Sequence, residues 1–219
     1  MKKSLFLMFL LFTSLLVSGQ NAKDDNESKW AVGVNLISFG NNVLNEGKLR
    51  YGNGVIVKRR FKTFTLRAGM EYYFDTYDIN EFRGYDAVSI GGKTNEFLLK
   101  FGIEKSIVSF KFISLYGALD LFGSRYYADL DFIGGGWGFY NENQNRTIYN
   151  VGLMPTVGLE FKIMDNFSIN TEFRIPFSKS FSNTRTIFFD TNISKSEKEN
   201  DFGFYYDKGF VSLTANYIF

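Results

Sequence analysis

Apolar side chains occupy every second position in eight separate stretches of this sequence, with mostly polar or small side chains between them. The stretch FTLRAGMEYYF, residues 64–74, is the clearest case. Its apolar positions are Phe64, Leu66, Ala68, Met70, Tyr72 and Phe74. A β-strand points successive side chains to opposite faces, so this two-residue period predicts a strand between two different surroundings. Together with 19% aromatic residues and only 2 prolines, the repeated pattern predicts an all-β chain.

The eight strands are expected to run antiparallel around a closed barrel. They are predicted at residues 30–38, 49–61, 64–74, 96–104, 113–121, 149–162, 167–177 and 211–219. Three short turns are expected at 62–63, 104–107 and 164–166, and four longer loops at 40–48, 75–93, 124–146 and 178–207. Short turns on one side and long loops on the other are typical of transmembrane barrels, whose strands need ~9–11 residues to cross a bilayer. We therefore predict an up-and-down barrel with short periplasmic turns and long extracellular loops.

Charge decides which face of such a barrel points outward. The polar face carries Arg50, Lys58, Arg60, Arg67, Glu71, Glu96, Lys100, Glu104, Asp120, Glu160, Lys162, Glu172 and Arg174. A lipid-facing Arg or Lys near the bilayer midplane costs ~2–4 kcal/mol, so this set facing lipid would exceed the ~5–15 kcal/mol that stabilises a domain. Arg59 and Lys111 break the outward apolar pattern, and both lie at expected strand ends. The polar face should line the lumen, where small glycines also fit a crowded concave wall.

The seven basic and six acidic lumen residues nearly cancel in charge. Buried charges must be paired, which predicts a lumen packed with ion pairs and hydrogen bonds. An ion path through the lumen is the alternative. Arg67 and Glu71 lie about 13 Å apart along one strand, so they should pair with neighbouring strands rather than with each other. Pro155 cannot donate to a ladder and is expected to mark a bulge.

The two ends of the chain suggest export and assembly. Residues 1–19 combine a basic start with an uncharged stretch, SLFLMFLLFTSLLV, that is too short to span a membrane, and predict a cleaved signal peptide. Residues 20–29 are expected to form a periplasmic tail and 30–219 the barrel. Removing Lys2 and Lys3 leaves 23 basic against 23 acidic residues, so nothing suggests nucleic-acid binding.

Residues 30–219 resemble the small eight-stranded outer-membrane β-barrels of Gram-negative bacteria. The closing TANYIF resembles their C-terminal assembly signal, with apolar or aromatic residues at alternate positions: Leu213, Ala215, Tyr217 and Phe219. The Phe-, Tyr-, Asn- and Lys-rich composition and the start at Gln20 further resemble Bacteroidota barrels. The resemblance implies a location in the outer membrane and contact with outer-membrane lipid, lipopolysaccharide and the barrel-assembly machinery.

The sequence contains few residues or motifs that could support catalysis or metal binding. It has no Cys and no His, which excludes disulfides, Cys/His metal sites and imidazole catalysis, including the catalytic His that barrel enzymes of this size use. SIGGKT, residues 89–94, lacks the first glycine of a phosphate-binding loop and precedes a strand. Spaced acids such as those in ADLDF fail the calcium-loop pattern, although binding of divalent cations at loop acids stays open.

The function expected from the sequence is non-enzymatic. We predict a monomeric surface structural or interaction protein that has no cofactor and binds an extracellular ligand or an envelope complex through its loops. The candidate binding residues are the loop aromatics Tyr126, Tyr127, Trp137, Tyr140, Tyr205 and Tyr206. The alternatives are a narrow passive channel for small solutes or ions, an enzyme, and a soluble ligand-binding barrel.

Overall fold

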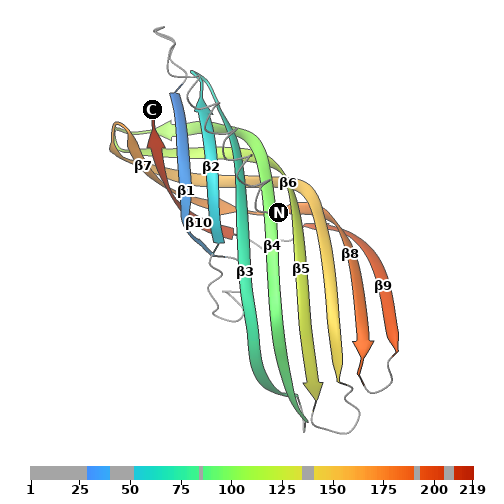
Figure 1. Ribbon diagram of the computed structural model, residues 1–219. Helices are drawn as coiled ribbons and strands as arrows, with labels where there is room; N and C mark the ends of the chain where they lie inside the picture. Colours follow the sequence, from blue (N-terminus) through green and yellow to red (C-terminus); the bar gives the residue numbers. More distant parts are fainter. Residues whose placement is uncertain (1–28, 40–51, 84–85, 135–140, 190–192, 205–209) are drawn as a thin grey trace, which may run out of the picture.

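The computed structural model describes residues 29–39, 52–83, 86–134, 141–189, 193–204 and 210–219, all built from β-strands and their connections (Figure 1). The strands are β1 Lys29–Phe39, β2 Gly52–Arg60, β3 Thr65–Arg83, β4 Asp86–Ser109, β5 Ile113–Gly134, β6 Glu142–Met164, β7 Phe167–Arg174, β8 Phe177–Phe188, β9 Ser194–Phe204 and β10 Phe210–Ile218. Within these ranges no helix has the length and apolar character needed to cross a membrane. The expected signal peptide, residues 1–19, lies outside the described residues.

The strands close into an antiparallel barrel. β1 to β6 pair in sequence order, β7 and β8 both pair with β6, and β10 pairs with β7 and with β1. Because β9 continues the sheet beside β8, the segments β7 and β8 form one wall strand, and β9 and β10 form another. Trp30 and Phe219 exchange backbone hydrogen bonds of 3.0 and 2.9 Å where β1 and β10 pair. The predicted eight-stranded antiparallel barrel is confirmed.

Pro155 does not mark a bulge. It pairs with Leu119 in an unbroken register, and its carbonyl accepts a hydrogen bond of 3.1 Å from the Ile175 N–H. The expectation was wrong because Pro155 lies opposite the break between β7 and β8. The hydrogen-bond ladder is interrupted there, so a residue without a backbone N–H does not disturb the pairing. The register shifts of this barrel lie elsewhere, for example between Lys162 and Met164.

Several strands are longer than a bilayer requires. β3 has 19 residues, β4 has 24, β5 has 22 and β6 has 23, against the ~9–11 that cross a membrane. Figure 1 shows these strands, with β8 and β9, continuing past the ends of β1 and β2. The loops predicted at 75–93, 124–146 and 178–207 are therefore wrong for most of their length, since most of these residues form a six-stranded extension in the order β3-β4-β5-β6-β8-β9.

The three short turns lie at or near their predicted positions. β2 and β3 are joined at Phe61–Phe64, where a backbone hydrogen bond of 2.8 Å closes the turn, and β6 and β7 are joined at residues 165–166. The turn expected at 104–107 lies instead at 110–112, because β4 continues to Ser109. The loop predicted at 40–48 lies outside the described residues.

The two faces of the barrel carry the side chains that the alternation assigned to them. Phe101, Leu119 and Val157 point outward and are 57%, 50% and 54% exposed, whereas Arg67 and Asp120 point inward and are 1% and 0% exposed. Small residues belong on the inner face. A Cβ at Gly158, for instance, would lie 2.4 Å from the ring of Tyr116. The polar-inside, apolar-outside prediction is confirmed.

Candidate functional site

Arg67 of β3 is the hub of a charge network inside the barrel. Its Nη1 lies 2.8 Å from Glu172 Oε1 and 3.2 Å from Glu104 Oε2, and its Nε lies 3.0 Å from Asp120 Oδ1. Its Nη2 also donates a hydrogen bond of 3.0 Å to the second oxygen of Glu172. One guanidinium therefore bridges carboxylates from β4, β5 and β7, and the two-pronged contact with Glu172 has the geometry that arginine favours with carboxylates.

Glu71, four residues along β3, is the second centre of the network and binds two other cations. Its Oε1 lies 2.9 Å from Lys100 Nζ and 2.6 Å from Arg174 Nη1, and its Oε2 accepts a hydrogen bond from the Tyr73 hydroxyl. As predicted, Arg67 and Glu71 each have a partner on the adjacent strand β4, Glu104 and Lys100, but both also reach β7 across the barrel.

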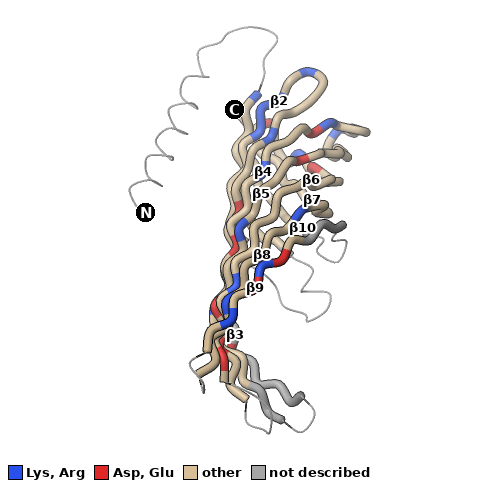
Figure 2. The backbone as a smooth tube through the Cα atoms, turned by 90° about the vertical axis from the view of Figure 1, so that its right-hand side faces the viewer, with Lys and Arg blue, Asp and Glu red and all other residues tan. Residues whose placement is uncertain are grey.

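The network is balanced in charge and shielded from solvent. Lys58 of β2 completes it, with its Nζ 2.7 Å from Glu104 Oε2. Its members are four cations and four carboxylates: Lys58, Arg67, Lys100, Arg174, Glu71, Glu104, Asp120 and Glu172. Their side chains are 0–7% exposed. Figure 2 shows basic and acidic positions interspersed along the strands. Charges buried this deeply are tolerated when they are paired, and each member of the network lies within 3.0 Å of an opposite charge, although the Asp120 carboxylate accepts no hydrogen bond from the described residues.

Neutral polar groups extend the network toward β10. The Tyr116 hydroxyl donates to Glu172 at 2.9 Å, and the Asn170 amide donates to Tyr116 at 3.3 Å. Asn216 of β10 in turn donates to Asn170 at 2.8 Å. Sequence reasoning did not select these three residues as site residues, although they share the inward parity of the charges on their own strands.

Other predicted lumen charges lie away from this network. Arg60 and Glu160 form their own pair near the short turns, with 2.5 Å between Nη2 and Oε1. Glu96 lies toward the strand extension, at the wall of a hollow of about 10 Å³ that Tyr73 and Tyr126 also line. Arg50 lies outside the described residues.

Lys162 was wrongly placed in the lumen network. Its side chain is 49% exposed, and its Nζ lies 2.9 Å from Asp165 Oδ1 in the turn between β6 and β7. A hydrogen bond and the positive charge of Lys162 lower the pKa of the Asp165 carboxyl below its ordinary value. The register shift beside Lys162 explains the error, because the strict alternation ends there.

The aromatic residues predicted to bind ligands in loops are only partly described. Tyr126 and Tyr127 lie in β5 rather than in a loop, and as neighbours in a strand they point to opposite faces. The Tyr127 hydroxyl donates a hydrogen bond of 2.9 Å to Asn145 of β6, so it is part of the sheet surface. The remaining candidates, Trp137, Tyr140, Tyr205 and Tyr206, lie outside the residues whose side chains are described.

Cations lie over aromatic rings at both ends of the outer apolar band. At the end with the short turns, the Arg59 guanidinium carbon lies 5.2 Å from the ring centre of Trp30, and Lys111 Nζ lies 5.3 Å from that of Phe112. Arg59 and Lys111 were the two outward charges expected at strand ends. At the other end, Arg125 and Lys179 lie over rings in the same way. Sequence reasoning missed Arg125 and Lys179 because it ended the strands before them. Both occupy outward-facing alternate positions if the strands are continued.

The arrangement consists of a charge-filled barrel interior and an apolar exterior bordered by aromatic residues, which is the organisation of outer-membrane β-barrels. Among the described residues, His, Cys, Asp and Glu form no cluster of three that could hold a metal ion. No protein-family model and no curated protein matches the sequence.

Solved structures of bacterial outer-membrane proteins are similar to this chain in fold. A major outer membrane protein from Thermus thermophilus has a TM-score of 0.50 and 10% identity, over 87% of this chain and 98% of that one. The attachment invasion locus protein Ail of Yersinia pestis, in complex with the heparin analogue sucrose octasulfate, has a TM-score of 0.42 and 14% identity, over 88% and 99%. CarO of Acinetobacter baumannii has a TM-score of 0.43 and 8% identity, over 90% and 100%. The likeness to the Thermus protein concerns the fold alone.

Proposed function

We propose that this chain is a non-enzymatic integral protein of the bacterial outer membrane, with a lumen closed by side chains, that acts at the cell surface through its strand extension. The observation that carries the proposal is the balanced network around Arg67, whose members are almost fully buried across the barrel. A continuous water path would leave such side chains exposed. Export by a cleaved signal peptide, and recognition of Tyr217 and Phe219 by the barrel-assembly machinery, belong to the same proposal.

The strand extension is the part of this chain best suited to contact a partner. Paired backbones hold its surface in place, so its side chains are presented with less loss of conformational entropy than in a free loop. Its outer surface is polar: the Asn143 amide donates to Asp129 and to Asp131, each at 2.9 Å. We propose that this surface binds an extracellular ligand or an envelope complex while the barrel remains monomeric.

Single-channel recording tests the closed lumen. The mature protein in a planar bilayer should show no steady unit conductance, because an ion would have to displace buried and paired charges. The lipid alone and a general porin are the controls for leakage and for sensitivity. A reproducible unit conductance that disappears with heat-unfolded protein would replace the proposed closed barrel by a narrow passive channel.

Placing an arginine on the outer face tests whether this face contacts the hydrocarbon of a bilayer. Leu119 is 50% exposed on β5 and lies six residues beyond Ile113, near the middle of the apolar band. Leu119→Arg should lower the free energy of unfolding in lipid vesicles by ~2–4 kcal/mol, whereas Ile113→Arg, at the start of the same strand, should lower it by ~0–1 kcal/mol. Urea titration followed by tryptophan fluorescence measures both. Equal costs at the two positions would argue against a bilayer around this face.

A further inference from the structure

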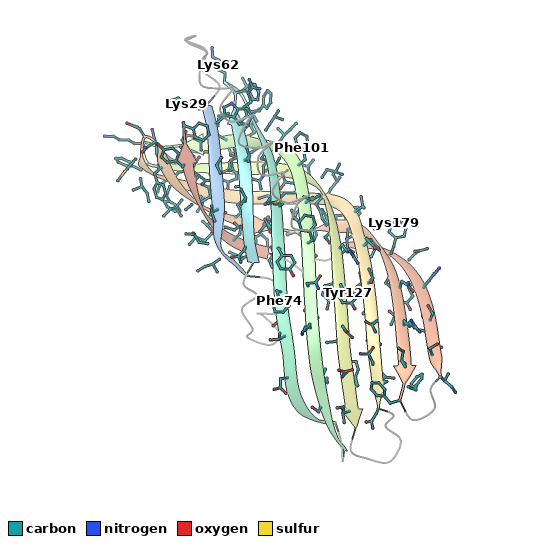
Figure 3. The ribbon with its side chains drawn as sticks, in the orientation of Figure 1. Lys29, Lys62, Phe74, Phe101, Tyr127 and Lys179 are labelled. Carbon is teal, nitrogen blue, oxygen red and sulfur yellow. The ribbon has the colours of Figure 1, made fainter. Side chains whose placement is uncertain are left out.

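Two cations and two rings form a patch on the outer face of β5, β6 and β8. The Arg125 guanidinium carbon lies 5.9 Å from the ring centre of Tyr149, and Lys179 Nζ lies 5.2 Å from that of Phe181. Tyr149 pairs with Arg125 on one side and with Phe181 on the other, so the four residues are neighbours in the sheet. We call these four residues the outer basic patch. Figure 3 shows Lys179 on β8, projecting from the sheet.

The position of the patch along the strands places it at headgroup level. Arg125 lies twelve residues beyond Ile113, where β5 begins, and Lys179 lies twelve residues beyond Phe167, where β7 begins. A strand rising ~3.3 Å per residue at a tilt of ~40° gains ~2.5 Å per residue along the membrane normal, which gives ~30 Å over this distance. The apolar band of an outer-membrane barrel is ~25 Å tall. Both cations therefore lie just beyond the hydrocarbon, on the side of the strand extension.

The two cations of the outer basic patch are not paired with any carboxylate of the described residues. Among the described residues, neither Arg125 nor Lys179 forms an ion pair with a carboxylate, although every cation of the lumen network does. The nearest acidic residue on this face of β5, Asp129, lies four positions beyond Arg125 and accepts a hydrogen bond from Asn143 instead. Cations held over aromatic rings at headgroup level, without an acidic partner, suit the phosphate groups of lipids.

We propose that the outer basic patch binds the phosphate groups of a phosphorylated glycolipid of the outer leaflet, of the lipid A class. Arg125 and Lys179 lie two strands apart, and their long side chains can engage two phosphates of one headgroup. Tyr149 and Phe181 lie beneath the two cations and border the acyl chains. This inference rests on the proposed location in the outer membrane, because only there does the extended side of the barrel face such a lipid.

The test uses the folded mature chain in a zwitterionic detergent, titrated with bis-phosphorylated lipid A and with dephosphorylated lipid A. The wild-type protein should bind the phosphorylated form more tightly. A cation near a charged membrane surface contributes about a fivefold gain in affinity, so Arg125→Gln with Lys179→Gln should weaken binding of bis-phosphorylated lipid A about 30-fold. Inorganic phosphate at millimolar concentration should not displace the lipid. Displacement would identify free phosphate as the ligand and overturn the lipid site.

The matched control removes two other cations from the same face. Lys93 and Arg185 share a row with Asp129 and Asn145, beyond the patch in the strand extension. Lys93→Gln with Arg185→Gln should change lipid A affinity less than twofold. Equal losses in the two double variants, or no loss in the patch variant, would overturn the proposal.

A charge-preserving variant and a folding assay separate loss of binding from loss of structure. Arg125→Lys with Lys179→Arg preserves both charges and should keep affinity within about threefold, and heat-modifiable gel migration reports whether each variant is folded. Cell fractionation tests the proposed function separately. Lipid A binding by a protein found outside the outer membrane would contradict the location and leave the binding chemistry intact, whereas an outer-membrane protein that does not bind lipid A would contradict the patch alone.

Discussion

Replacing Arg67 with methionine should lower the free energy of unfolding by about 3–5 kcal/mol, the cost of removing one partner from a buried ion pair. Methionine keeps an unbranched apolar stem but has no charged end, so three carboxylates lose the guanidinium that bridges them. Asp120 loses its ion-pair partner among the described residues, whereas Glu104 keeps Lys58 at 2.7 Å. The uncompensated charge on Asp120 should dominate the loss.

Urea unfolding in lipid vesicles, followed by tryptophan fluorescence, measures this effect. Arg67→Met combined with Asp120→Asn restores the charge balance and should recover part of the loss. Lys162→Met removes a cation outside the network and should change stability by less than about 0.5 kcal/mol, because its ion pair is exposed. An Arg67→Met barrel as stable as the wild type would show that the lumen charges are not coupled as their distances indicate.

Gly152→Val should destabilise the barrel by about 3 kcal/mol, at the upper end of the cost of inserting atoms into a packed interior. A Cβ at Gly152 of β6 would lie 2.0 Å from the Phe177 carbonyl oxygen and 2.6 Å from Ser178 Cα, both of which are backbone atoms. A flexible side chain could move aside, whereas relief here requires β6 and β8 to separate. The change therefore acts on the joint between the barrel and the strand extension.

Gly123→Val is the matched control for this substitution. It lies on the adjacent strand β5, where the nearest atom to a new Cβ, the Asn150 carbonyl oxygen, is 3.8 Å away. Its outward position can accept a side chain, so we expect a change below about 1 kcal/mol in the same urea titration. Comparable losses at Gly123 and Gly152 would indicate that both glycines are needed for backbone freedom rather than for close approach.

The lumen site could be predicted well from local pattern alone. A single apolar face repeated eight times leaves one arrangement that hides the charges, and this places Arg67, Glu71 and Glu172 inside together. The partner of each charge was not predictable, because pairing depends on the register between strands. Arg67 reaches Glu172 across a separation of 105 residues, a contact that only the closed barrel creates.

The strand extension could not be recognised from the same pattern. Apolar alternation reports a difference between the two sides of a strand, and in the extension polar and apolar side chains are mixed on both sides: Ile90 lies on one face and Ile133 on the other. Residues 75–83 therefore look like a loop in the sequence, although they pair with β4 without interruption. Arg125 and Lys179 were assigned to loops for the same reason, which concealed the outer basic patch.

The two-residue alternation was enough to assign each side chain to the outer or the inner face, because successive side chains of a strand point to opposite sides and the charges gather on one of them. Which charges meet, how far the strands continue, and where Arg125 and Lys179 lie relative to each other became clear only in the folded barrel. These features depend on the registers β4–β5, β5–β6 and β6–β8, which are set by the whole closed barrel rather than by any one strand.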